Sequence, residues 1–317
     1  MSTAHPDGGP RPQQAAGDGA PHSYYGRPIV KAPPWSDNIP WYLFSGGLAG
    51  GSATLALAAR LAGNQRLAAN AMSASASGVA ASLGLLVHDL GRPSRFHHML
   101  RVVKPTSPMS IGSWILAALG PAAVGAAVAE RLGIFPRLRR VAEVVAGVLG
   151  PPLATYTGAL IADTSVPTWH DAGQELPLLF AAGAAASAGG LAVIVTPPAE
   201  AGPARRLAVG GAVLEVATSE VMRRRLGPLA QPYRQGRAKR LSSLATATAG
   251  AGVLLLGLGG RRRATAAAGG GLLLLSSAFQ RFAVYRAGVA SADDPSYTVS
   301  RQRERIASSG QEPAIRR

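Results

Sequence analysis

The chain has 317 residues, of which 47% are hydrophobic and 15% are charged, and its formal net charge is +16. Most of the charge lies at the two ends and in short clusters between apolar runs, a pattern that favours a membrane protein over a soluble one. Cysteine is absent, so this chain cannot form disulfides, ligate an iron–sulfur cluster or use a catalytic thiol.

The first 38 residues are polar and rich in proline and glycine, as in PDGGPRPQQAAGDGAP. We interpret residues 1–38 as a disordered tail followed by an extended arm, YYGRPIVKAPPW, and we expect no cleavable signal peptide. A second polar tail is expected over residues 285–317, which include DDPSY and RQRER.

Between the tails, the pattern predicts an all-α integral membrane protein with eight transmembrane helices in a bundle. A helix needs about 20 apolar residues to cross a hydrocarbon core of roughly 30 Å, whereas barrel strands alternate over about 10 residues. The sixth stretch is the weakest, because Glu215 lies inside it. Within residues 39–284, the predicted spans are 39–61, 67–88, 110–129, 141–161, 176–195, 207–222, 241–260 and 264–282.

The charge distribution predicts an orientation. An even number of spans places both termini on one side of the membrane, and most of the 32 Lys and Arg residues fall on that side. Because cytoplasmic loops carry the excess of positive charge, we expect both termini in the cytoplasm and the bundle in a bacterial plasma membrane. Topology therefore accounts for the positive charge without a nucleic-acid partner.

The first predicted helix begins with polar and aromatic residues, Asn38, Trp41 and Tyr42. Interfacial aromatic side chains usually anchor a helix at the membrane surface, so anchoring and ligand contact both remain open for this group. Further along, the run SGGLAGG contains two interleaved small-xxx-small spacings, which predict close packing of helix backbones in lipid.

A polar cluster, HDLGRPSRFHHML, follows the second predicted helix. Gly91 and Pro93 end that helix, which places His88 and Asp89 at its end, on the side of the termini. Asp89 either pairs with a nearby arginine at the membrane surface or belongs to the polar rim of a functional site. The next loop returns Lys104 to the same surface.

The fourth predicted helix contains Pro151 and Pro152, which should disturb its hydrogen bonding. Tyr156 then lies within the bilayer, where its hydroxyl needs a partner from the protein or from a ligand. Asp163 lies at the membrane edge, again on the side of the termini. Three separate segments are thus predicted to converge on one membrane face.

Glu215 lies about midway along the sixth predicted helix. Because an ionised carboxylate costs several kcal/mol in lipid, this residue is either functional, for example on a proton path, or a neutral acid bonded to a neighbouring Ser or Thr. Haem is not expected, because none of the histidines lies at mid-span, and no metal-binding spacing stands out. The six histidines are His5, His22, His88, His97, His98 and His170.

Together these motifs resemble the polysulfide-reductase membrane-subunit family, often called NrfD/PsrC. The resemblance covers residues 24–290 and depends on YYGRP, IPWYLFSGGLAGG, DLGRPSRFHHML, KPTSPMSIGSW and YTGALIADT. It implies an eight-helix subunit without haem that exchanges electrons between the membrane quinone pool, expected to be menaquinone, and an iron–sulfur subunit. That partner in turn serves a molybdopterin catalytic subunit.

For this chain the resemblance implies a quinone pocket on the side of the termini. His88 and Asp89 would handle protons at its edge, since histidine titrates near neutrality. Where relatives can carry a histidine on the first helix, this sequence has Tyr42. The expected pocket residues are Asn38, Trp41, Tyr42 and Tyr156, with Lys104 and Asp163 at the rim.

Two alternative functions stay open on the sequence. A secondary transporter is compatible with the number of helices and with Glu215, although that class favours charges that converge at mid-membrane from both halves. A structural anchor would tie a peripheral enzyme to the bilayer without binding quinone. Bound quinone in the purified complex separates the anchor from the redox subunit.

Overall fold

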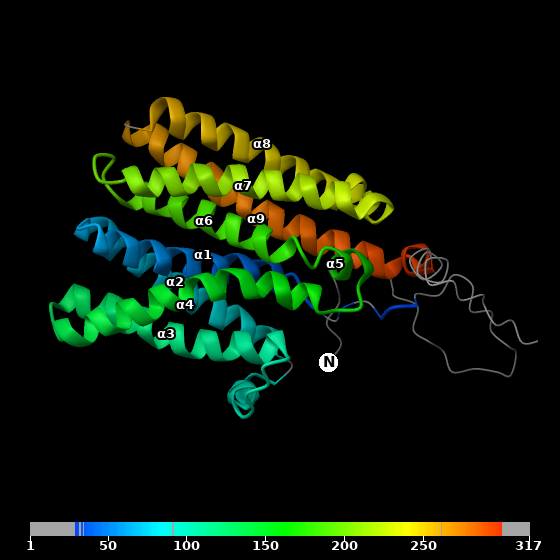
Figure 1. Ribbon diagram of the computed structural model, residues 1–317, viewed down its shortest axis with the longest axis horizontal. Coiled ribbons are helices and arrows are strands. Elements are labelled where there is room, and N and C mark those ends of the chain that lie inside the picture. The colour runs from blue at the N-terminus through cyan, green and yellow to red at the C-terminus, as the bar shows by residue number, and fades with distance from the viewer. Residues whose placement is uncertain (1–28, 32, 34, 91, 261, 300–317) are drawn as a thin grey trace, which may run out of the picture.

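The computed structural model describes residues 29–31, 33, 35–90, 92–260 and 262–299, which are predominantly helical and contain no strand. Within these residues eight long helices run along the molecule (Figure 1), and three short ones connect them. The long helices are α1 (Asn38–Leu61), α2 (Gln65–Asp89), α3 (Pro108–Leu132), α4 (Pro136–Ala162), α6 (Leu176–Val195), α7 (Gly202–Leu226), α8 (Gly236–Gly259) and α9 (Arg263–Asp293). The short ones are η1 (Pro93–Leu100), α5 (Pro167–Asp171) and η2 (Gly227–Arg234).

The predicted all-α fold is confirmed, but the predicted count of eight membrane spans is not. In the described part of the chain, six helices are long and apolar enough to cross a membrane, namely α1, α2, α3, α4, α6 and α8. Helices α7 and α9 fall outside that set. Both helices carry charged residues: α7 holds Glu215 between arginine-rich ends, and α9 holds Arg281 and Arg286. A long helix nevertheless occupies each of the eight predicted stretches.

Several helices extend beyond their predicted limits. Helix α7 begins at Gly202, and α9 continues to Asp293, past the expected start of the C-terminal tail at residue 285. Helix α4 runs unbroken through Pro151 and Pro152. The disturbance expected at these prolines therefore does not end the helix.

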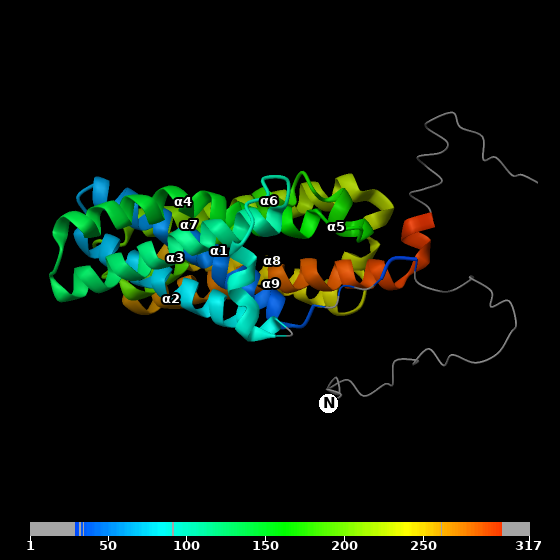
Figure 2. The ribbon, with the colours of Figure 1, turned by 90° about the horizontal axis from the view of Figure 1, so that it is seen from below.

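The long helices form two groups of four that lie side by side. Helices α1 to α4 pack on one another, as do α6 to α9, and the groups meet mainly where α1 and α4 contact α6. The described residues before α1 (29–31, 33 and 35–37) are called the arm below. They lie, with helices α5 and η2 and the end of α9, towards one end of the bundle, which is called the arm end (Figures 1 and 2).

Glycines let α1 approach two neighbouring helices closely. A Cβ atom at Gly50 would lie 2.5 Å from the carbonyl oxygen of Gly150 on α4, and one at Gly51 would lie 2.6 Å from that of Ala184 on α6. Close backbone approach stabilises helix pairs in lipid. The two small-residue spacings of the first helix therefore serve two different contacts.

A buried ion pair connects three helices of the second group. Arg281 on α9 contacts Glu215 on α7, with 3.3 Å between Nη1 and Oε1, and its Nη2 donates a 2.6 Å hydrogen bond to the carbonyl oxygen of Phe180 on α6. Both charged side chains are buried. Gly183 provides the space, because a Cβ atom there would lie 2.1 Å from Glu215 Oε1. The pair compensates two charges that would each be costly alone in an apolar interior.

We expect Glu215→Met or Arg281→Met alone to lower the free energy of unfolding by about 3–5 kcal/mol, because each leaves one buried charge unpaired. The double substitution removes both charges and should cost clearly less than the sum of the two. Chemical unfolding of the detergent-solubilised protein, followed by circular dichroism, measures all three variants. Additive losses would show that the two side chains are not energetically coupled.

Candidate functional site

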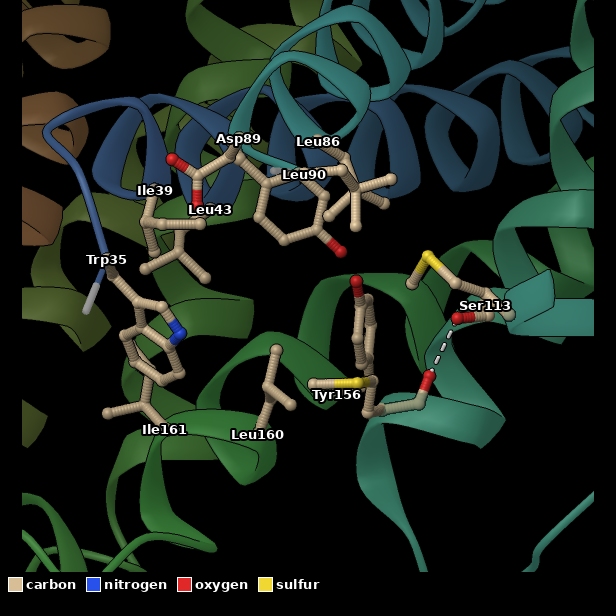
Figure 3. Close-up of a pocket in the computed structure, with 13 residues that line it drawn as sticks. Trp35, Ile39, Leu43, Leu86, Asp89, Leu90, Ser113, Tyr156, Leu160 and Ile161 are labelled. Atoms are coloured by element: carbon tan, nitrogen blue, oxygen red, sulfur yellow. Dashed lines mark hydrogen bonds between the residues drawn. The ribbon is translucent and has the colours of Figure 1, made fainter. Parts of the chain in front are cut away.

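A cavity of about 440 Å³ lies within the first group of helices, near the arm end. Helices α1, α2, α3 and α4, the arm and η1 all contribute to its wall (Figure 3). The wall is mainly apolar, with polar groups at a few positions. The lining residues are Trp35, Ile39, Tyr42, Leu43, Leu86, Asp89, Leu90, Met99, Met109, Ser113, Tyr156, Leu160 and Ile161.

Two tyrosines from helices far apart in sequence line this cavity. Tyr42 on α1 is 4% exposed and Tyr156 on α4 is 8% exposed, and the Tyr156 hydroxyl points into the cavity (Figure 3). Neither hydroxyl forms a hydrogen bond within the described residues. A tyrosine hydroxyl in an apolar setting normally has a partner, so these two groups are available to a ligand.

The Tyr156 ring fits because α3 has a glycine opposite it. A Cβ atom at Gly112 would lie 2.0 Å from Cε2 of that ring. Ser113, the next residue on α3, also lines the cavity, but its hydroxyl donates a 2.9 Å hydrogen bond to the Met109 carbonyl oxygen of its own helix. The tyrosines are therefore the free hydroxyl donors of this wall among the described residues.

Asp89 adds a carboxylate at the arm end of the cavity. It is the last residue of α2 and accepts a hydrogen bond from the hydroxyl of Ser36 in the arm. The cavity thus combines two donors in an apolar wall with one acidic group at its edge. That arrangement can hold a flat, mainly apolar ligand by two polar atoms and exchange a proton with it.

The arm is fixed over the cavity by aromatic and polar contacts. Trp35 stacks on the buried Trp169 of α5, with 5.7 Å between ring centroids, and its carbonyl oxygen accepts a 2.6 Å hydrogen bond from Tyr285 on α9. Asp37 accepts two hydrogen bonds from Arg286, of 2.7 and 2.8 Å. The end of α9 therefore positions one wall of a cavity that lies in the other helix group.

Of the eight residues expected in the quinone pocket, at its edge or at its rim, the structure brings together Tyr42, Asp89 and Tyr156. Asn38 and His88 lie elsewhere, which corrects that expectation. They contact each other, with 3.0 Å between Nδ2 and Nδ1, and line a more open depression on another face of α1 and α2. Adjacent residues on a helix diverge by about 100°, so His88 and Asp89 point to different faces.

Trp41 also lines the outer depression rather than the cavity. It is half exposed and packs edge to face against Phe44 and Phe282, with centroid distances of 6.1 and 5.1 Å. This setting agrees with the membrane-anchoring alternative for an interfacial aromatic residue.

The remaining predicted site residues do not line the cavity. Lys104 and Asp163 are exposed and do not line it. Glu215 lies in the other helix group, paired with Arg281. The sequence did not indicate a role for Arg281, because this residue lies one position before the predicted end of the last span, where an arginine is common. It did not indicate a role for Trp35 either, because nothing in the sequence of the arm shows that this side chain lines a cavity.

Six apolar helices, with a largely apolar cavity among four of them, define a multi-pass membrane protein. Residues 30–201 match the family model described as polysulphide reductase, NrfD. The match spans more than half of the chain and includes every residue of the cavity wall, so the chain belongs to this family. Membership indicates a membrane subunit of a reductase complex. No curated protein matches the chain.

We expect Gly112→Ala to distort the cavity, because the new methyl group would overlap the Tyr156 ring. Overpacking of this kind should lower the free energy of unfolding by about 1–3 kcal/mol. Gly125→Ala, on the same helix with nothing within 4 Å of the new Cβ atom, is the matched control. Thermal unfolding in detergent compares the two, and equal midpoints would contradict the tight contact described here.

Proposed function

We propose that this chain is the quinone-exchanging membrane subunit of its reductase complex, in a bacterial plasma membrane. It would exchange electrons between the quinone pool, menaquinone in the first instance, and an iron–sulfur subunit that serves a molybdopterin catalytic subunit. The observation that carries this proposal is the pair of unpartnered hydroxyls, Tyr42 and Tyr156, in a cavity whose wall is otherwise mainly apolar.

The cavity suits a quinone ring in size and chemistry. Its volume of about 440 Å³ lies within the range of small-molecule sites, roughly 300–1,000 Å³. A quinone is a flat apolar ring with two carbonyl oxygens, and the site offers apolar contacts from Leu43, Leu160 and Ile161 together with hydroxyl donors. When bound, quinone supplies two-electron chemistry that takes up or releases two protons.

The residues of this chain would then bind, orient and move protons. Tyr42 and Tyr156 would each donate a hydrogen bond to a ring oxygen. Asp89 would accept a proton at its carboxylate, where Ser36 already donates a hydrogen bond. His88, on the outer face of α2 beside Asn38, would pass the proton to the aqueous side.

Glu215 has no part in this proposal, because it lies outside the cavity and is paired with Arg281. For the same reason the structure does not favour the transporter alternative, which needs charges from both halves of the protein at one site. An anchor without quinone remains the other outcome of the experiment below.

We expect Tyr42→Phe and Tyr156→Phe each to lower kcat/KM for quinol about three- to tenfold, the loss of one hydrogen bond. The measurement uses the intact complex, purified with its partner subunits, with a soluble quinol analogue. Tyr297→Phe removes a tyrosine hydroxyl outside the cavity wall and serves as the matched control. Wild-type kcat/KM in both cavity variants would favour the anchor without quinone.

A further inference from the structure

A second recess lies at the arm end of the other helix group, between the end of α7, η2 and the start of α8. Its volume is about 720 Å³. Helix α7 packs chiefly on α6 and α8 chiefly on α9, so the two helices that flank this recess have their closest partners elsewhere. The recess is called the α7–α8 groove below, and it contains no residue of the cavity described above.

The groove carries a surplus of positive charge. Its wall includes four cationic side chains and one carboxylate, Glu220, which already accepts hydrogen bonds from Arg223 at 3.0 Å and Arg224 at 2.8 Å. Arg234 and Lys239 are exposed and form no ion pair within the described part of the chain. Two cations therefore face the groove without a carboxylate partner, which favours an anionic ligand.

A buried hydroxyl in the same wall also lacks a partner. Tyr233 on η2 is 3% exposed, lines the groove, and has a hydroxyl with no hydrogen bond in the described residues. Burial raises the pKa of Tyr233, so its hydroxyl stays protonated. The hydroxyl therefore needs an acceptor to which it can donate a hydrogen bond. Beside it, Arg223 donates a 2.8 Å hydrogen bond to Ser242 on α8, which holds the guanidinium in the groove.

Along the helices the wall of the groove changes from charged to apolar. A phospholipid changes in the same order, from its charged headgroup to its acyl chains. The cations lie just outside the predicted spans 207–222 and 241–260, whereas Ser243, Thr246 and Ala247 continue the wall along α8 into its span. Beyond them α8 exposes apolar side chains, Leu254 among them. Basic recesses between helices at a membrane surface are typical sites for anionic headgroups.

We propose that the α7–α8 groove binds the phosphate group of an anionic phospholipid, with Tyr233, Arg234 and Lys239 as its contacts and the acyl chains along the outer face of α8. A free phosphate ion would satisfy the same three side chains but not the apolar continuation of the groove. A soluble acidic partner would satisfy the exposed cations but would not reach the buried Tyr233 hydroxyl. An anionic phospholipid contacts both the three polar side chains and the apolar continuation of the groove. Its binding does not depend on the proposed quinone function.

Native mass spectrometry of the full-length chain tests this proposal by titration with phosphatidylglycerol and, separately, with phosphatidylcholine. We expect preferential binding of phosphatidylglycerol, weakened about tenfold or more by Arg234→Gln combined with Lys239→Gln, since each basic residue near a lipid surface contributes substantially. Tyr233→Phe should weaken binding about threefold, the loss of one hydrogen bond. Arg137→Gln combined with Arg140→Gln, which removes two exposed cations at the start of α4, is the matched control and should leave the preference unchanged.

Three outcomes would overturn the proposal. The first is the same phosphatidylglycerol affinity in the groove double variant as in the wild-type chain. The second is an equal loss in the α4 control, which would indicate general charge attraction. The third is full competition by inorganic phosphate at the concentration of the lipid, which would identify an ion site without a lipid. Retained folding of each variant is checked by its thermal midpoint, and Tyr233→Phe tests the site without any change of charge.

Discussion

The close contact between α1 and α4 at Gly50 and Gly150 determines the geometry on which the proposed function depends. A Cβ atom on either glycine would lie 2.5 Å from the carbonyl oxygen of the other, so the two backbones touch. The helices run in opposite directions, and from this contact Tyr42 lies about 12 Å along α1 and Tyr156 about 9 Å along α4, both towards the arm end. The glycine contact therefore sets how closely the two tyrosines face each other across the cavity.

The two helix groups differ in what their polar side chains do. The first holds a cavity with unpartnered hydroxyls and lies wholly inside the family match, whereas α7, α8 and α9 lie beyond residue 201. In that second group two buried charged side chains, Glu215 and Arg281, pair with each other. The groups are nevertheless connected, because α9 fixes the arm through Tyr285 and Arg286. Stability of the second group therefore affects the wall of the first.

The sequence was sufficient for properties that depend on neighbouring residues. Long apolar runs identified every long helix, and the alternation of turns placed Tyr156 and Asp89 at the same end of the bundle. It was insufficient where the answer depends on which way a side chain points or on a distant partner. His88 and Asp89 are adjacent, yet only one faces the cavity. Arg281 pairs with a residue 66 positions earlier, and no periodicity reveals such a pair. Trp35 became part of the cavity wall through contacts with α5 and α9 that its proline-rich segment does not indicate.

Photolabelling with a quinone analogue that carries a reactive group on its ring shows directly whether quinone occupies the cavity between α1 and α4. After irradiation of the intact complex, peptide mass spectrometry locates the label along the chain. We expect adducts in the arm-end segments of α1 and α4, around residues 39–43 and 156–161, and we expect unlabelled menaquinone to compete with the label. Specific, competed labelling confined to α7, α8 and α9, or no competed label in this subunit, would contradict it.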